Sequence, residues 1–446
     1  MFLPALADTL DGSLILAYMN NPTLNAQRAS ARATDEGVPQ ALSGYRPRVT
    51  VIGSIGSQYW DTTNKPSVNL PVYIHQSGTM TPNNYGITAT QTLYNGFQNA
   101  NRTRQAESQV QAARENLRVA DQSVLLSAVT AYMNLLRDSA ILDLQRRNVE
   151  VLQEQLRQTR DRFNVGEVTR TDVAQSESRL AAGRSQVLAA EATYKASVAT
   201  YRQVIGVEPG KLAPGSPVDR FSPSNLPQSV GVATATHPAV TTAQYNVDAA
   251  LLQVKVAEGA LYPTLLVQGS VQQQNELSQN ALKSFNAAAI AQLTVPIYQG
   301  GAEYSLVRQA KETLGQRRLD LDTARDQVRQ NVVQSWGQLD AAKANIEATQ
   351  AQVQAAEIAL NGVREEARVG QRTTLDVLNA QQELVNARVA LVSAQRDRVV
   401  ASFTLLSAVG RLSPQVLGLR VPVYDANVHY QQVRDTWAGV RTPDGR

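Results

Sequence analysis

Few side chains in this sequence have the types and spacing that catalysis or metal binding needs. The three histidines, His75, His237 and His429, are far apart in the chain and lack the spacing of metal ligands. Cysteine is absent, which excludes disulfides, thiolate metal sites and cysteine nucleophiles. The adjacent Glu365 and Glu366 point to different sides of a helix and make no acid–base pair. Because catalytic and phosphate-loop motifs are also missing, we predict that the protein is not an enzyme and has no catalytic, cofactor or metal site.

The most regular polar spacing belongs to two threonine–aspartate pairs. Thr169-x-x-Asp172 and Thr373-x-x-Asp376 have the pattern of capping boxes, in which the hydroxyl and the carboxylate bond to free N–H groups at the start of a helix. A glycine three residues before each threonine supplies the permissive backbone of a turn. We therefore predict turns at 164–170 and 368–374, each followed by a helix.

These pairs belong to a sequence that is written twice. From Leu93 to Gly206 the second copy follows at a constant offset of 204 positions, for example 298 minus 94 and 376 minus 172. Further upstream the offset is 216, as in 263 minus 47, so the first copy has twelve extra residues between Gly53 and Leu93. A repeat of this length is too long for a solenoid unit and indicates a duplicated domain.

The segment before each turn is predicted to be one very long helix. Residues 98–165 contain no proline or glycine, and a helix of about 68 residues would be roughly 100 Å long. Apolar residues recur every seven positions, which is typical of a coiled-coil seam. The seam of the first copy is Val110, Leu117, Val124, Ala128, Leu135, Leu142, Val149, Leu156 and Phe163; that of the second is Leu314, Leu321, Val328, Val332, Leu339, Ile346, Val353 and Leu360.

Ahead of each helical hairpin lie two segments with the alternation of β-strands. In the first copy Val49, Val51 and Ile55 alternate with polar residues, and the second copy alternates in the same way from Leu265 to Val271. Turn-rich segments at 61–84 and 275–283 separate the strands of each pair. Aromatic residues lie at the predicted strand ends, where membrane barrels carry interfacial aromatics: Tyr59, Trp60 and Tyr85 towards the loop, and Tyr45, Tyr94, Tyr262 and Tyr298 towards the helices.

The predicted domain order follows from these elements. A signal remnant at 1–7, if it is one, precedes the first repeat at 8–206, which has a helix, strands at about 46–60 and 82–96, and a helical hairpin at about 97–206 with its tip at 164–172. A connector at 207–231 leads to the second repeat at 232–410, with a helix, strands at about 262–275 and 284–299, and a hairpin at about 301–410 with its tip at 368–376. Residues 411–446 form a C-terminal segment and tail, and this segment is expected to lie beside the connector as an equatorial collar around the middle of the helices. These ranges rest on the repeat and on Pro/Gly-rich boundaries.

Composition bears on two kinds of partner, nucleic acid and a membrane. The net charge is +4 and the basic residues are evenly spread, so no nucleic-acid partner is predicted. No uncharged apolar stretch approaches the roughly eighteen residues of a membrane helix, so entry into a membrane would require strands.

Residues 1–7 end in Ala-Leu-Ala, which resembles a signal-peptidase site without the charged and apolar regions that should precede it. They are either the remnant of a signal peptide or a coincidental Ala-rich start.

Neither the strands nor the helical seams are complete in one chain. Four strands cannot close a membrane barrel with a usable interior, and an open sheet edge in lipid leaves backbone groups unsatisfied. Several chains would therefore have to share one barrel and pack their hairpins side by side. The alternative is a soluble or peripheral coiled-coil scaffold without a channel, which the heptads favour and the four alternating segments oppose.

Three features of the chain resemble the TolC family of outer-membrane efflux proteins. They are the duplicated hairpins, the Tyr-x-Gly junctions at 94–96 and 298–300, and the second tip, Val-Gly-Gln-Arg-Thr-Thr-Leu-Asp-Val-Leu at 369–378. The resemblance covers nearly the whole chain. It implies a homotrimer, mainly α with a transmembrane β part, in which a twelve-stranded β-barrel in the outer membrane continues into a twelve-helix α-barrel crossing the periplasm. It also implies export of drugs or proteins from a Gram-negative cell, by tripartite efflux or type I secretion, with a periplasmic adaptor and an inner-membrane pump.

The resemblance further implies a periplasmic gate. Thr171, Asp172 and Arg372 match contacts that hold the closed end, while Asp376 and the position of Asn379 match acidic rings of the constriction. Asn379 replaces an aspartate and Ala367 replaces a gate tyrosine, so we expect a weaker latch and a constriction less attractive to cations. On residue chemistry alone, the two aspartates could be simple capping groups and Arg372 a solvated arginine.

The same resemblance assigns the tips to adaptor docking. Val165-Gly166-Glu167 and Val369-Gly370-Gln371 match the family's docking motif in their first two residues, and the third residue of each is expected to alter adaptor preference. Both glycines are also expected to serve as turn glycines.

Overall fold

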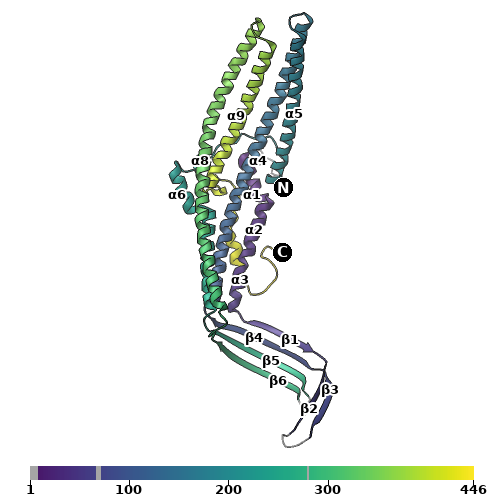
Figure 1. The fold of residues 1–446 in the computed structure, drawn as a ribbon, viewed down its shortest axis with the longest axis vertical. Coiled ribbons are helices and arrows are strands. Elements are labelled where there is room, and N and C mark those ends of the chain that lie inside the picture. Colours follow the sequence, from purple (N-terminus) through teal and green to yellow (C-terminus); the bar gives the residue numbers. More distant parts are fainter. Residues whose placement is uncertain (1–8, 67–71, 279–280, 446) are drawn as a thin grey trace. The chain divides into compact units, whose positions relative to one another are not determined.

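The fold was obtained as a computed structural model that describes residues 9–66, 72–278 and 281–445 (Figure 1). The expected signal remnant at 1–7 lies outside these residues. The chain begins with α1 (Leu10–Asn20), α2 (Pro22–Asp35), α3 (Gly37–Leu42) and the 3₁₀ helix η2 (Ser43–Tyr45). Among the described residues, no helix combines the length and apolar character that crossing a membrane requires.

Two very long helices follow the heptad seams. They are α4 (Gln98–Asn164) and α8 (Ala302–Arg368), each of 67 residues, and they begin and end within a few residues of the predicted bounds. Nearly all of the seam residues in α4 are buried, from Val110 to Leu156, whereas Phe163 near the tip is exposed. In α8 the buried seam residues are Leu314, Val328, Val332, Leu339 and Leu360. A seven-residue apolar period therefore identified the packed face of both helices.

Each long helix turns back into a shorter partner. These are α5 (Arg170–Ile205) after α4 and α9 (Thr374–Ala408) after α8. Gly206 and Gly410 have φ of +89° and +82°, a left-handed conformation that stops each return helix where the sequence repeat places a glycine.

The connecting segments contain short helices as well as loops. The predicted connector at 207–231 contains η3 (Asp219–Phe221) and the start of α6 (Leu226–Thr236), so the helix begins earlier than expected. His237 separates α6 from α7 (Pro238–Gly259) and its Nδ1 accepts a hydrogen bond from the Ala239 N–H at 3.1 Å. The last helices are α10 (Pro414–Leu417) and α11 (Ala426–Val433).

The chain divides into two compact units that do not follow the repeats. One comprises residues 1–31, 112–244 and 320–426, and its largest buried side chains include Tyr132, Tyr201 and Phe403. The other comprises residues 32–111, 245–319 and 427–446 and contains every strand that the structure describes. Residues from both copies therefore contribute to each unit.

The larger sheet joins strands from both copies. Its order is β1 (Arg48–Ile55), β4 (Asn83–Asn95), β5 (Thr264–Ser278) and β6 (Ala281–Thr294), and every neighbouring pair is antiparallel. One row across the sheet is Val51, Ile87, Val271 and Ala287, and the adjacent row is Thr50, Thr88, Ser270 and Ala288. Since side chains alternate between faces, one face carries the apolar row and the other the small or polar row.

One predicted strand is wrong in its extent. The segment at about 46–60 is two strands, because β1 ends at Ile55 and β2 (Gln58–Asn64) pairs with β3 (Ile74–Met80) in a separate two-stranded sheet. The Gly56 N–H donates to the Pro82 carbonyl at 2.9 Å, which ends the β1–β4 ladder beside a residue without a side chain. The segment at 61–84, expected to be a loop, therefore contains most of β2 and all of β3.

Candidate functional site

The first hairpin tip is closed by a capping box and a local ion pair. The Thr169 N–H and hydroxyl donate to Asp172 Oδ2 at 2.9 and 2.7 Å, and the Asp172 N–H donates back to Thr169 Oγ1 at 3.3 Å. Gly166, at φ +80°, lets the chain reverse so that the Glu167 N–H reaches the Arg162 carbonyl at 2.9 Å. Arg162 Nε also lies 3.0 Å from Glu167 Oε2. The tip is therefore ordered by bonds within its own hairpin.

The second tip repeats this backbone with a different ion pair. The Thr373 N–H and hydroxyl donate to Asp376 Oδ2 at 3.0 and 2.9 Å, and Gly370 also has φ +80°. The backbone N–H of Thr373 is the main reason that the pKa of Asp376 lies below its ordinary value. Arg372 Nε donates to Glu366 Oε2 at 2.9 Å, and this bond raises the pKa of Arg372.

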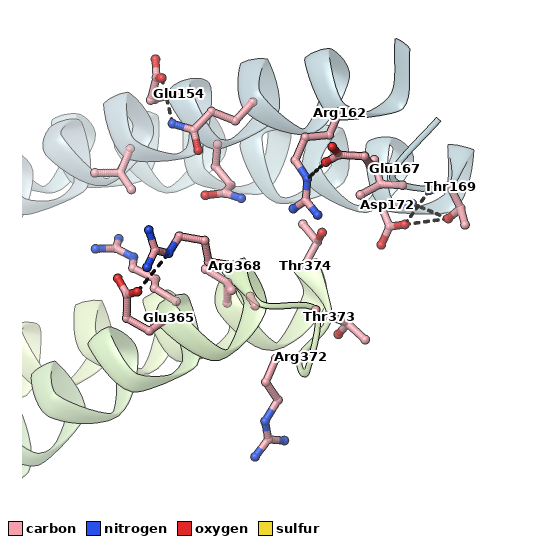
Figure 2. Close-up of a pocket in the computed structure, with 18 of the residues that line it drawn as sticks. Glu154, Arg162, Glu167, Thr169, Asp172, Glu365, Arg368, Arg372, Thr373 and Thr374 are labelled. Carbon is pink, nitrogen blue, oxygen red and sulfur yellow. Dashed lines mark hydrogen bonds and ion pairs between the residues drawn. The ribbon is translucent and has the colours of Figure 1, made fainter. Parts of the chain in front are cut away.

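The two tips line one groove of about 1020 Å³ (Figure 2). The first hairpin contributes mainly acids and the second mainly arginines. The acidic side is Glu150, Glu154, Glu167 and Asp172, with Arg162 among them; the basic side is Arg364, Arg368 and Arg372, with Glu365 among them. The groove therefore has opposite charges on its two walls.

Only two of the predicted gate residues, Asp172 and Arg372, line this groove. The guanidinium of Arg372 extends away from Asp172 in Figure 2, and its hydrogen bond goes to Glu366. Thr171 is exposed, and Asp376 serves as the cap of α9. Within one chain, the structure does not bring the predicted gate residues together as a cluster.

Asn379 has a partner that the sequence did not reveal. Arg179 of α5 donates to Asn379 Oδ1 of α9 at 2.6 Å, so the half-buried arginine and the exposed asparagine connect the return helices of the two hairpins. The 200 residues between them explain why sequence spacing gave no signal. Ala367, at the position of the expected gate tyrosine, packs against the small cluster of Leu360, Val377 and Leu384.

The predicted docking residues present apolar side chains at the ends of both hairpins. Val165 and Val369 are exposed, and each precedes its turn glycine. Glu167 is paired as described, and Gln371 is exposed with its N–H bonded to the Glu366 carbonyl at 2.9 Å. An exposed valine beside a rigid turn is a small apolar contact that a partner could cover.

The larger sheet exposes its apolar row. Val51, Ile87 and Val271 are 73%, 52% and 49% exposed although they lie in the middle of their strands. Among the described strands, β1 pairs only with β4 and β6 pairs only with β5, so each has an unpaired edge. In the described part of the chain, the apolar row and the outer edges of β1 and β6 are therefore left uncovered.

The predicted interfacial aromatics all belong to the unit that contains the strands. Tyr85 lies on β4 near the loop end of the sheet, while Tyr59 and Trp60 lie on β2 in the smaller sheet. Tyr94 ends β4, and the other three flank strands: Tyr45, Tyr262 and Tyr298. Apart from Trp60, which is half-buried, all are exposed.

The described residues contain no group of three or more histidine, aspartate or glutamate side chains placed to hold a metal ion. His75 lies beside Asp61 at 3.3 Å and His429 beside Asp35 at 3.0 Å. The clusters that do occur are a charged groove, a capped pair of tips and an apolar sheet face.

A sheet of this kind joined to long helical hairpins is matched by one family model. The model describes an outer membrane efflux protein and matches residues 14–207 and 230–411. The chain belongs to the outer membrane efflux protein family. The two matched segments cover both copies of the repeat, and the resemblance to the TolC family is thereby confirmed.

Curated relatives and solved structures agree with this assignment. The chain is 43% identical to the outer membrane efflux protein BepC of Brucella suis over 443 residues, covering 99% of this chain and 94% of the relative. It is 25% identical to the alkaline protease secretion protein AprF of Pseudomonas aeruginosa, covering 67% and 64%. The CmeC outer membrane channel of Campylobacter jejuni has the same fold, with a TM-score of 0.78 at 17% identity over 96% of this chain and 89% of that one.

The protein is therefore an outer-membrane channel of the efflux or type I secretion kind. This outcome favours the channel over the alternative of a coiled-coil scaffold, which accounted for the heptads but not for the strands.

Proposed function

We propose that three copies of this chain form a homotrimer with one twelve-stranded barrel in the outer membrane and one twelve-helix tunnel in the periplasm. The supporting observation is the pair of unpaired edges on β1 and β6, because a barrel in lipid can leave no edge open. With four strands in the larger sheet of each chain, three chains supply twelve. The row of Thr50, Thr88 and Ser270 would then line a polar interior, and the row of Val51 would face lipid.

The same assembly makes the sequence duplication useful. Each chain has two equivalent hairpins, one in the repeat at 8–206 and one in the repeat at 232–410. The connector at 207–231 joins the repeats, and the C-terminal segment at 411–446 follows the second. Six such hairpins around one axis provide the twelve helices of a tunnel. Closed rotational symmetry is the usual arrangement for identical chains that must complete one another's surfaces.

The cargo follows from the kinds of relative. BepC is named for efflux and AprF for alkaline protease secretion, so this channel exports drugs or proteins. In this proposal the exposed tips at Val165-Gly166-Glu167 and Val369-Gly370-Gln371 dock a periplasmic adaptor, which connects the tunnel to an inner-membrane pump. The aromatic residues Tyr45, Tyr59, Trp60, Tyr85, Tyr94, Tyr262 and Tyr298 contact outer-membrane lipid at its interfaces.

The tips also form the gate in this proposal. Thr171 and Asp172 of one chain would accept hydrogen bonds from Arg372 of another, and Asp376 with Asn379 would line the constriction. The support is geometric: both tips are held by capping boxes, and the Arg372 guanidinium extends away from Asp172 of its own chain. Arg372 would then exchange or share its bond to Glu366 on closing.

Single-channel recording in a planar lipid bilayer tests the gate. Arg372→Ala removes the proposed latch and is expected to raise conductance several-fold, with Asp172→Ala acting in the same direction. Arg162→Ala is the matched control, because Arg162 makes a similar exposed ion pair on the first tip and has no gate role. Equal conductance of the native channel and Arg372→Ala would refute the gate assignment.

Adaptor docking is tested separately by crosslinking in cells. A photoreactive side chain at position 165 or 369 is expected to capture a periplasmic protein. Capture should be lost when the valine of the other tip, at 369 or 165, is changed to aspartate. Position 188, an exposed leucine in the middle of α5, serves as the control. Capture at position 188 with none at the tips would contradict the docking assignment.

A further inference from the structure

The C-terminal segment is fixed to the unit that contains the strands. Tyr430 of α11 packs beside Val38, Ala106 and Val110, which form a small buried cluster. His429 Nδ1 lies 3.0 Å from Oδ2 of the buried Asp35. These contacts hold α11 against the start of α4 and the end of α2, so the residues after α11 leave from a defined place.

Arg46 holds the chain that follows α11. Its Nη1 donates to the Thr436 carbonyl at 2.7 Å, and its guanidinium carbon lies 4.7 Å from the centre of the Trp437 ring. A guanidinium at this distance attracts the face of an indole. Because Arg46 stands two residues before the start of β1 at Arg48, these contacts bring Trp437 to the junction between the helices and the larger sheet.

Trp437 is exposed although it is held by specific contacts. The side chain is 71% exposed, and tryptophan is usually well buried in a folded protein. Val440, three residues further on, is also fully exposed. An ordered and exposed tryptophan beside an arginine is an arrangement that suits a boundary between apolar and polar surroundings.

A second aromatic residue at the same junction is held at a conformational cost. Phe97 has φ +62°, which is unfavourable for any residue with a side chain, and is 66% exposed. Its ring contacts Tyr94 edge to face with centroids 5.5 Å apart. In the second copy the matching residue is Gly301, at φ +86°, so the backbone alone does not require an aromatic residue there.

We propose that the C-terminal arm, residues 434–440, is a lipid-contacting anchor that places Trp437 in the membrane interface at the helix-facing ends of the strands. Arg46 then lies at the level of the lipid phosphates while the indole ring lies among the glycerol and upper acyl groups. Tryptophan and tyrosine favour this zone because they have an apolar ring and a polar N–H or O–H group. The partner is the phospholipid leaflet, with the exposed Tyr45 and Phe97 on the same junction.

This anchor rests on the proposed crossing of the membrane by the strands, and the experiment separates the two. The chain has three tryptophans, Trp60, Trp336 and Trp437, so replacing two with phenylalanine leaves a single fluorescent reporter. Each variant is reconstituted as the full-length protein in vesicles of phosphatidylethanolamine and phosphatidylglycerol, with or without bromine on the acyl chains. Brominated lipid quenches a tryptophan only at close range.

Two further reporters calibrate the result. The variant that keeps only Trp336 should not be quenched, because Trp336 lies on α8, not on a strand, and packs with Val328 and Val332. A variant with Val51→Trp and no other tryptophan should be quenched strongly, since this position is on the apolar face of β1. The Trp437 reporter is expected to lose about half of its intensity in brominated vesicles, as an interfacial indole should.

The quenching of the Val51→Trp and Trp437 reporters separates the anchor from the barrel. Quenching at Val51→Trp without quenching at Trp437, together with easy quenching of Trp437 by aqueous iodide, overturns the anchor and leaves the barrel proposal intact. Absence of quenching at both positions overturns the membrane placement of the strands and the anchor with it. Arg46→Gln in the Trp437 reporter should reduce the quenching at least twofold, whereas Arg46→Lys should retain most of it. Unchanged quenching in Arg46→Gln would show that Arg46 does not position the ring.

Discussion

The turn after α4 and the turn after α8 have the same backbone and opposite arrangements of charge. Gly166 and Gly370 share φ +80°, and both turns end in a threonine–aspartate capping box. In the first turn the loop contributes the acid, Glu167, to an arginine of the preceding helix; in the second the loop contributes the base, Arg372, to a glutamate of the preceding helix. Duplication therefore preserved what the backbone requires while the exposed pairs diverged.

The strand-to-helix junctions differ in the same way. Gly96 and Phe97 in the first copy match Gly300 and Gly301 in the second, and all four residues have positive φ. A β-carbon at Gly96 would lie 2.3 Å from the Gly259 carbonyl oxygen, whereas the space around Gly300 is open to 4 Å among the described residues. The first junction is packed and the second is not, although their backbone conformations are alike.

Alanine substitutions at Gly96 and Gly300 are expected to give the largest difference in stability between the two copies. Gly96→Ala adds both a steric collision with backbone and an unfavourable φ, so we expect it to lower the free energy of unfolding by about 3 kcal/mol or more. Gly300→Ala adds only the unfavourable φ and should lower it by about 1 kcal/mol. Thermal unfolding of the purified variants in detergent measures both. Equal losses would mean that the packing around Gly96 does not matter.

A second contrast concerns the middle of the long helices. Burial raises the pKa of the Asp121 carboxyl to about 6, although Arg28 and Arg118 act in the opposite direction. The buried Oδ1 of Asp121 has no hydrogen-bond partner among the described residues. The matching residue of the second copy, 204 positions later, is the exposed Arg325, which pairs with Asp322 at 3.3 Å. One copy therefore has a half-buried acid where the other exposes a base.

Asp121→Asn tests this contrast through pH. Because the folded state holds the proton more tightly than the unfolded state, stability should fall as pH rises from about 4 to about 6. A shift of about two pKa units is worth at most roughly 3 kcal/mol, which partial exposure reduces to about 1.5 kcal/mol. The variant should match the native protein below about pH 4 and exceed its stability by that amount at neutral pH. An identical pH profile for the two proteins would contradict the burial of the charge.

The capping boxes should behave alike in the two copies. Thr169→Ala and Thr373→Ala each remove a side-chain cap and should destabilise the first turn of α5 or α9 by about 1 kcal/mol. Hydrogen exchange of the amides in that turn reports the loss locally. Thr171→Ala is the control, because Thr171 lies in the same first turn without capping it. Comparable exchange in Thr171→Ala and Thr169→Ala would rule out the cap as the cause.

The smallest effect is expected from the ion pairs that differ. Arg162→Gln and Glu366→Gln each break one exposed pair and should change stability by only about 0.3 kcal/mol. Raising the salt concentration should reduce even this difference. A loss above about 1 kcal/mol in Glu366→Gln alone would indicate that the second tip is covered by another chain and that its charges are desolvated.

Much of the helical architecture could be predicted because it depends on local rules. The seven-residue seam and the absence of glycine and proline determined α4 and α8, and Thr169 and Thr373 located the start of each return helix. The alternation of apolar and polar residues identified the rows of the larger sheet, since Val51 and Ile87 lie on one face as expected. These features require only the neighbours in sequence.

The rest depends on contacts between distant residues. The break at Gly56 was invisible because the alternation continues through it into β2, and only the Pro82 carbonyl shows where the ladder ends. The same is true of Arg179 with Asn379 and of Arg46 with Trp437, which are hundreds of residues apart. The burial of the Asp121 carboxylate could not be predicted either, because a charged residue in a helix is ordinarily exposed.

In the proposed homotrimer, β1 of one copy pairs with β6 of the next copy. The chain has no cysteine, so an introduced pair reports only its own bond. Thr50→Cys on β1 is combined in turn with cysteine at 286, 288, 290 and 292 on β6, and the protein is oxidised in the outer membrane and separated on a non-reducing gel. Disulfides require α-carbons within about 7 Å, so only paired edges can link. We predict a ladder of bands that ends at three linked chains for one or two of these combinations. A single-chain band at every position, or a ladder that continues beyond three chains, would contradict the pairing of β1 with β6.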